Sequence, residues 1–145
     1  MQVNYLTKNS KQTQKLGEKI ALQLRSGQAV VLALQGDLGS GKTTFLQGFA
    51  KGLGIKEKIL SPTFIIVKRF KLRNYNFKNF YHIDCYRIKN YKDLDKLGFK
   101  DIIASPENIV AVEWPEKIKK ILPKSTITIE FDFIDKNKRR ITINF

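Results

Sequence analysis

A glycine-rich segment, residues 36–44 with the sequence GDLGSGKTT, constrains the fold of this chain more than any other feature. It matches the pattern G-x-x-x-x-G-K-S/T without a gap, and Lys42 and Thr43 complete the pattern. Glycines allow backbone angles that other residues avoid, and they let bare N–H groups approach phosphate oxygens. The lysine adds a point charge near the outer phosphates, and the threonine hydroxyl is a ligand for Mg²⁺. The segment therefore predicts a phosphate-binding loop.

The segments on either side of this loop agree with that prediction. Residues 29–34, AVVLAL, form a continuous apolar run that is typical of a central parallel strand covered on both faces. After the loop, Phe45, Phe49 and Leu53 recur at steps of four, and Gly54 follows as a stop signal for a helix. A chance match on a glycine turn is the alternative. A strand before the loop and a helix after it disfavour that alternative.

Strands and helices alternate along the rest of the chain. Before the loop we expect a short extended segment and then a helix that begins near Asn9 or Ser10, with Leu16, Ile20 and Leu24 on its buried face. Further elements are expected in this order: a β-hairpin from 63–70 and 79–84, a short helix at 91–97, a strand at 108–114, and a second hairpin from 127–133 and 141–145.

These elements predict an α/β fold, namely a three-layer sheet of the P-loop NTPase type with flanking helices and antiparallel hairpin additions. We expect one domain over residues 1–145, because a chain of this length buries roughly 70% of its unfolded surface without a disulfide or metal. The N-terminal residues lack the apolar run of a signal peptide, and the longest apolar stretch is too short to cross a bilayer. A cytoplasmic protein without membrane association is therefore expected, and the lone Cys85 agrees because one cysteine forms no intrachain disulfide.

The charge balance leaves two interpretations. The chain has 27 Lys and Arg residues against 13 Asp and Glu residues, a formal net charge of +14. A field of this sign attracts nucleic-acid backbones. Lysines that merely cover solvated faces give the same balance, and here they are scattered along the whole chain. We favour the second interpretation and keep direct RNA contact as the alternative.

Two acidic residues stand at the ends of predicted strands. Asp84 ends NFYHID and Glu113 ends NIVAVE. A P-loop requires a second ligand on the metal side, usually a carboxylate at the end of a neighbouring strand, and ligands of open α/β sheets bind at the carboxyl edge. A solvated rim charge is the ordinary role of an acid at such a position. Two of them beside a phosphate loop favour a role at the metal or the reacting water.

Several other residues near these positions are weaker candidates. His82 faces the same side as Asp84 on a strand, and a structural role is favoured over that of a general base. Trp114 fits a packing residue or a lid. Thr63, in SPTF, belongs to a loop whose hydroxyls reach phosphate or metal, although a proline turn before a strand explains the same residues. Cys85 has no identifiable activating partner, and no role is assigned to it.

The segments taken together resemble a known family. LQGDLGSGKTTFLQGFAKGLGI, SPTF, YHIDCYRI, LGFKDII, and ENIVAVEWPEKI with ILP follow one another in this order. The set resembles the TsaE family, also called YjeE, the small bacterial P-loop ATPases of tRNA modification, over about residues 10–145. The phosphate loop alone is not specific for that family, whereas the combination of SPTF, H-x-D-x-Y-R and VEWPE is.

The resemblance implies a concrete function. The chain would hydrolyse ATP with Mg²⁺ and act with the TsaB and TsaD proteins, and with the threonylcarbamoyl-AMP synthase TsaC. The product would be N6-threonylcarbamoyladenosine at position 37 of tRNAs that read ANN codons. We expect tRNA to be reached through the TsaB–TsaD complex and not directly.

The resemblance also implies roles for individual residues. Thr43 and Glu113 correspond to the Mg²⁺ ligands, Asp84 to an acid needed for activity, and Thr63 to a switch-type threonine near the γ-phosphate. The implied catalytic residues are Asp84, Lys42 and Thr63. The implied nucleotide-binding residues are Thr13, on the adenine side, and Asp37, Leu38, Gly39, Ser40, Gly41, Lys42, Thr43 and Thr44.

Other P-loop functions remain as alternatives. A kinase of a small metabolite usually carries an arginine-rich lid, and no such segment stands out. A GTPase is disfavoured because the guanine-reading pattern N-K-x-D is absent, and DKNK at 135–138 does not match it. No arginine that would stabilise the transition state is identifiable, so we expect a partner to supply one and the isolated protein to be slow.

Overall fold

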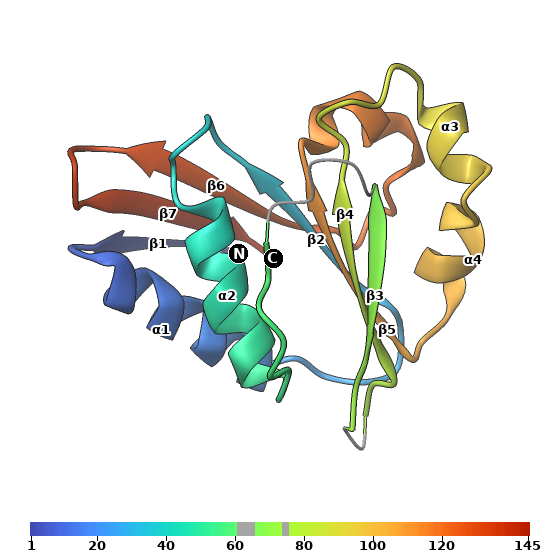
Figure 1. Cartoon of the computed structure of the whole chain (residues 1–145), viewed down its shortest axis with the longest axis horizontal. Coiled ribbons are helices and arrows are strands. Elements are labelled where there is room, and N and C mark those ends of the chain that lie inside the picture. Colours follow the sequence, from blue (N-terminus) through green and yellow to red (C-terminus); the bar gives the residue numbers. More distant parts are fainter. Residues whose placement is uncertain (61–65, 74–75) are drawn as a thin grey trace.

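The computed structural model of the protein contains a mixed sheet of seven strands with helices on both faces (Figure 1). It describes residues 1–60, 66–73 and 76–145. The strands are β1 (Gln2–Thr7), β2 (Val30–Gln35), β3 (Val67–Lys71), β4 (Asn79–Asp84), β5 (Asn108–Glu113), β6 (Ile127–Phe133) and β7 (Arg139–Asn144). The helices are α1 (Ser10–Leu22), α2 (Lys42–Gly52), α3 (Tyr91–Asp95), α4 (Phe99–Ala104) and the 3₁₀-helix η1 (Pro115–Ile121).

The centre of the sheet is parallel and its two sides are antiparallel. The strand order is β1-β7-β6-β2-β5-β4-β3. The β2 strand pairs in parallel with both β5 and β6, and β4 pairs in parallel with β5. The pairs β3–β4, β6–β7 and β1–β7 are antiparallel. The expected α/β fold with two added hairpins is therefore present, although residues 63–65 of the first expected hairpin lie outside the described residues.

One face of the sheet is covered by α1 and α2, which lie side by side (Figure 1). As expected, Asn9 caps the start of α1, and its side chain accepts a hydrogen bond of 2.9 Å from the backbone N–H of Gln12. The two helices touch at glycines, and a Cβ on Gly48 would lie 1.8 Å from the backbone oxygen of Gln14. Behind them the rings of Phe49 and Phe80 pack with centroids 5.6 Å apart.

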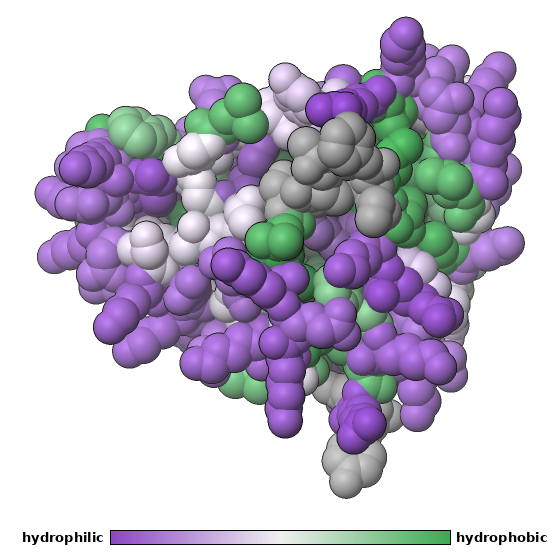
Figure 2. All heavy atoms as spheres, viewed as in Figure 1, coloured by the Kyte–Doolittle hydropathy of each residue, from purple (hydrophilic) through white to green (hydrophobic). Residues whose placement is uncertain are grey.

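The other face is covered by α3, α4 and η1, which form a second core. Leu94, Phe99 and Ile118 are fully buried there with Val110 and Val112 of β5. The expected helix at 91–97 is present as α3, whereas α4 and η1 were not predicted. Figure 2 shows hydrophilic side chains over α1 and α2, while apolar surface gathers between β3 and the helices α3 and α4.

None of the helices in the described part of the chain has the length and hydrophobicity needed to cross a membrane.

Candidate active site

The glycine-rich segment forms the turn between β2 and α2, at the carboxyl end of the central strand (Figure 1). Gly39 and Gly41 have φ angles of +78° and +105°, which glycine adopts without the strain other residues incur. No side chain caps the first turn of α2. The N–H groups of that turn are therefore directed at an open space with the positive end of the helix dipole behind them, as an anion site requires.

Lys42, the first residue of α2, folds back over the loop. Its Nζ donates a hydrogen bond of 2.6 Å to the backbone oxygen of Gly36 and lies 4.0 Å from the centroid of the Trp114 ring. Burial lowers the pKa of this ammonium group, and the charge of Glu113, the next largest influence, raises it. The lysine charge is thus held at the loop by a carbonyl and an aromatic face.

Trp114 is the one non-glycine residue with a positive φ in the described part of the chain, at 57°. A left-handed backbone costs an L-residue roughly 1–2 kcal/mol, and such strain clusters at functional sites. The conformation turns the chain sharply after β5 and brings the indole over Lys42. The tyrosine ring of Tyr86 packs against the same indole, with centroids 5.2 Å apart.

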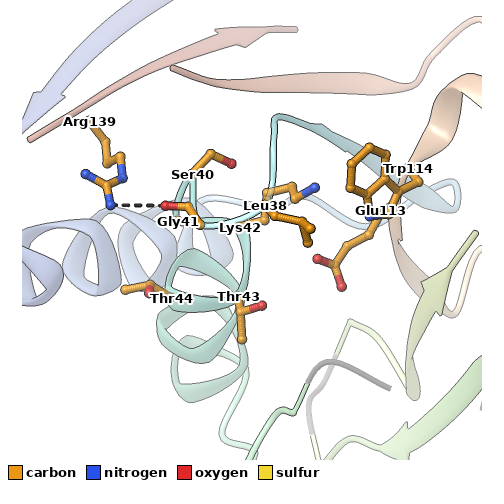
Figure 3. A pocket seen from close by; sticks show the side chains of 10 residues that line it. Leu38, Ser40, Gly41, Lys42, Thr43, Thr44, Glu113, Trp114 and Arg139 are labelled. Atoms are coloured by element: carbon orange, nitrogen blue, oxygen red, sulfur yellow. Dashed lines mark hydrogen bonds between the residues drawn. The ribbon is translucent and has the colours of Figure 1, made fainter. Parts of the chain in front are cut away.

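A cavity of about 180 Å³ opens beside the loop. Its lining includes, besides the loop itself, Thr43, Glu113, Trp114 and Arg139. Figure 3 shows the hydroxyl of Thr43 and the carboxylate of Glu113 pointing toward the same space from opposite sides. Hydroxyl and carboxylate oxygens are hard ligands of the kind that Mg²⁺ prefers, so these two residues fit the metal side of a nucleotide site.

The sheet register explains why these groups meet. Glu113 ends β5, which is the direct neighbour of β2, and its Cα is paired with that of Leu34 just before the loop. On the other side Glu113 is paired with Asp84 at the end of β4. The Asp84 carboxylate accepts a hydrogen bond of 2.9 Å from the N–H of Tyr86, and burial raises its pKa. Asp84 does not line the cavity, but stands one strand further from the loop.

His82 and Glu113 form a buried pair beneath this edge. The distance from His82 Nε2 to Glu113 Oε2 is 2.7 Å, and the two side chains are 2% and 4% exposed. The histidine thus has a hydrogen-bond partner in the site itself. Cys85, which directly follows Asp84, is fully buried, and burial raises the pKa of its thiol to about 12. A thiol in this state is unreactive, so no role is assigned to Cys85.

Arg139, which has no recognisable signal in the sequence, reaches the loop from β7. Its guanidinium donates through Nη2 to the backbone oxygen of Gly39 at 3.1 Å, a contact drawn in Figure 3, and through Nη1 to the backbone oxygen of Asp135 at 2.6 Å. Its Nε is buried without a hydrogen-bond partner. An arginine of this chain therefore stands at the phosphate loop, although no transition-state arginine was identifiable from the sequence.

A second, smaller hollow continues from the first one past Arg139. It is lined by Ser10, Thr13, Gly41, Thr44, Lys136, Asn137 and Arg139. Thr13 is buried and its hydroxyl lies 2.8 Å from that of Thr7. Thr13 and Thr44, both predicted nucleotide-binding residues, are thus brought to one place next to the loop, on the side away from Glu113.

Besides Asp84, two predicted site residues are not placed in either hollow. Asp37 lies in the loop, where its backbone oxygen accepts a hydrogen bond of 3.1 Å from Ser40, and its role stays a prediction. Thr63 lies outside the described residues. Within the described part of the chain no three His, Cys, Asp or Glu residues are grouped as a metal site would require. A metal here would depend on Thr43, Glu113 and the oxygens of the nucleotide itself.

Comparison with known proteins gives a consistent result. Residues 7–141 match the family model described as "Threonylcarbamoyl adenosine biosynthesis protein TsaE". A tRNA threonylcarbamoyladenosine biosynthesis protein TsaE from Bacillus subtilis is 35% identical over 141 residues, which are 97% of this chain and 84% of that protein. The protein of the same description from Haemophilus influenzae is 34% identical over 117 residues, 81% of this chain and 72% of that protein. The crystal structure of Bacillus subtilis YdiB superposes with a TM-score of 0.77 at 31% identity, covering 99% of this chain and 84% of that one.

Proposed function

The chain belongs to the TsaE family and has a role in tRNA threonylcarbamoyladenosine biosynthesis, and from that premise we propose that it is a Mg²⁺-dependent P-loop ATPase. It supports the TsaB–TsaD complex in forming N6-threonylcarbamoyladenosine at position 37 of tRNAs that read ANN codons. The observation that carries the ATPase proposal is the arrangement of Thr43 and Glu113 on opposite sides of one cavity beside the phosphate loop.

The residues of the site have distinct tasks in this proposal. The N–H groups of the loop and of the first turn of α2 bind the phosphates. Lys42 turns from the oxygen of Gly36 to the outer phosphate oxygens, exchanging one acceptor for another. Thr43 and Glu113 hold Mg²⁺, which neutralises charge on the phosphates when bound. Asp84, at the neighbouring strand end, orients the attacking water and accepts its proton.

Arg139 contributes on the other side of the loop. Its bonds go to Gly39, and it shares the smaller hollow with Thr13 and Thr44. That position, away from Glu113, fits the inner phosphates or the ribose and not the oxygen where charge develops at the γ-phosphate. We therefore keep the proposal that a partner supplies any transition-state arginine, and that the isolated protein turns over slowly.

Nucleotide binding is tested first. The Lys42→Ala variant should lose ATP binding in calorimetry, because the loop then lacks its charge. The Lys124→Ala variant, which changes an exposed lysine just before β6, serves as the control. Unchanged ATP affinity in the Lys42→Ala variant would contradict the proposal.

The function is tested by reconstituting the tRNA modification in vitro with the TsaB and TsaD proteins. ATP turnover should rise when the complex is added, and modification should fail with Thr43→Ala or Glu113→Ala. The matched controls are Thr128→Ala on β6 and Glu107→Ala, an exposed acid just before β5. If the partners change neither turnover nor modification, the proposal fails. ADP formation that depends on an added small acceptor would instead identify a kinase.

A further inference from the structure

The buried pair of His82 and Glu113 has a geometry that the proposed metal site depends on. In the register of β4 and β5, His82 is paired with Ala111, and Glu113 lies two residues further along on the same face. The imidazole thus reaches forward along the sheet to the carboxylate at the strand end. The separation of 2.7 Å between Nε2 and Oε2 is that of a charge-assisted hydrogen bond.

A buried carboxylate needs a partner, because removing it from water without one is costly. Lys42, whose pKa is lowered by burial and raised by the charge of Glu113, directs its Nζ to the oxygen of Gly36 and the ring of Trp114. His82 is 2% exposed and supplies the hydrogen bond to the Glu113 side chain in the described part of the chain. The imidazole donates from Nε2–H in its neutral form as well as in its protonated form. The contact therefore does not depend on a change of protonation.

The two oxygens of Glu113 are used differently. His82 engages Oε2, on the buried side. The carboxylate also lines the cavity, where it points toward the space that the Thr43 hydroxyl faces (Figure 3). The hydrogen bond to Oε2 restricts the Glu113 side chain to a conformation in which the other oxygen, Oε1, faces the cavity, whereas an unbonded glutamate samples several rotamers.

We infer that His82 is a positioning residue for the metal ligand: its Nε2–H fixes the Glu113 carboxylate so that the second oxygen faces Thr43 and the bound Mg²⁺. This inference rests on the proposed function, since it assumes that the site binds Mg²⁺ with a nucleotide. Hydrogen-bonded partners of this kind commonly change metal affinity by about 10-fold to 100-fold when they are removed. A histidine that only fills space would not affect the metal selectively.

Side-chain geometry provides a matched pair of variants. The amide nitrogen of glutamine is as many bonds from the backbone as Nε2 of histidine, whereas that of asparagine is one bond shorter. His82→Gln therefore keeps a donor at the position that reaches Glu113, and His82→Asn keeps a polar amide that does not reach it. His82→Leu removes the donor altogether. Thermal unfolding shows which of the three variants are folded.

The measurement is the affinity of the nucleotide-loaded protein for the metal, followed by electron paramagnetic resonance of Mn²⁺ in place of Mg²⁺ with ADP saturating. We expect the dissociation constant of Mn²⁺ to rise about 10-fold or more in His82→Asn and His82→Leu, and to stay within about 3-fold in His82→Gln. Metal-free ADP affinity should be unchanged in all three. In a Glu113→Gln background, His82→Asn should have no further effect.

Two results would overturn this inference and leave the proposed function unaffected. One is a wild-type metal affinity in folded His82→Asn. The other is that the affinity for Mn²⁺ and the affinity for ADP without metal fall equally in all three variants, including His82→Gln. That result would show that the histidine acts through packing. If the wild-type protein binds ADP without any effect of Mn²⁺ or Mg²⁺, the proposed function falls, and the inference falls with it.

Discussion

At the scale of single residues, Arg139 shows how a site is completed from a distance. It is 100 residues from Gly39 in the sequence, yet its guanidinium bonds to the Gly39 backbone oxygen and to the turn that precedes β7. The arginine thus joins the phosphate loop to the β6–β7 hairpin. Among the described residues its buried Nε has no hydrogen-bond partner, and the residue lines both hollows beside the loop, where the proposed nucleotide would bind.

Replacing Arg139 should therefore weaken nucleotide binding more than it slows hydrolysis. We expect Arg139→Ala to raise the dissociation constant of ADP by about 10-fold, equivalent to about 1.4 kcal/mol, and to change kcat much less. The control is Arg140→Ala, which removes the next, exposed arginine of the same strand. Calorimetry and steady-state kinetics measure both effects. A large fall in kcat with unchanged affinity would assign Arg139 to the transition state instead.

Cys85 gives a second prediction at this scale. Because burial raises the pKa of its thiol to about 12, the thiolate fraction at pH 8 is about 10⁻⁴. Surface lysines do not lower the pKa of this thiol enough to ionise it, since the Cys85 side chain is fully buried. We expect native protein to resist a thiol-reactive dye at pH 8 and denatured protein to react at once with one equivalent. Rapid labelling of the native protein would contradict the burial of this residue.

The candidate residues that the sequence indicates are those that carry a local signal. The glycine loop has a fixed spacing, and Asp84 and Glu113 follow apolar runs that end at the same sheet edge. Arg139 has no such signal, because an arginine in an alternating strand is indistinguishable from a solvated one. Its place follows from the pairing of β6 with β7 and the turn between them, which no short stretch of sequence encodes. The His82–Glu113 contact likewise depends on the register of two strands.

At the scale of elements, the packing of α1 on α2 holds the phosphate loop in place, because α2 begins inside that loop. The contact is closest at glycines of both helices. A Cβ on Gly17 would lie 2.2 Å from the backbone oxygen of Phe45, and one on Gly48 would lie 1.8 Å from that of Gln14. Backbone atoms cannot rotate away, so any side chain there must push the helices apart.

We therefore expect Gly48→Ala to lower the free energy of unfolding by about 3 kcal/mol and to weaken nucleotide binding as α2 shifts. The control is Gly54→Ala, where the added Cβ meets no atom within 4 Å but the φ angle is +81°. That substitution should cost roughly 1 kcal/mol from backbone strain alone. Urea denaturation compares the two. Equal losses would show that the close helix contact is not what Gly48 provides.

The longer elements were recognisable in the sequence, and among the short helices only α3, with five residues, was expected. The strands β2, β5 and β6 and the helix α2 repeat their pattern over enough residues to be recognised. The helix α4 spans six residues and η1 is a 3₁₀ segment of seven. The helix α4 is shorter than two turns, and η1 is interrupted at Ile118, whose φ and ψ angles are not helical, so both depend on the apolar face of β5 that they cover.

At the scale of the whole molecule, the proposed nucleotide site joins segments from both ends of the described chain. Ser10 and Thr13 of α1, the phosphate loop and the residues before β7 line the same hollow. Binding of a nucleotide should therefore stabilise regions that are far apart in the sequence, since a ligand that binds only the folded state protects every segment that holds it.

Hydrogen exchange with mass spectrometry measures this directly. On addition of ADP and Mg²⁺, we expect exchange to slow in the phosphate loop, in the first turn of α1 and in the turn at residues 135–138. Exchange in α3 and α4, on the opposite face of the sheet (Figure 1), should change little. Protection restricted to residues 36–44 would show that the hairpin and α1 do not take part in binding.

The position of β7 between β1 and β6 has a consequence for the order in which the protein acquires its fold on the ribosome. Synthesis delivers β1 first, but its partner in the sheet is β7, and Gln2 pairs with Asn144, 142 residues later. A nascent chain therefore emerges with its phosphate loop early, while β1 waits unpaired and Arg139 has not yet been made. The pocket beside the loop is complete only after β7 has joined the sheet between β1 and β6. Translation of the described chain is therefore nearly finished before a bound nucleotide can stabilise the folded protein.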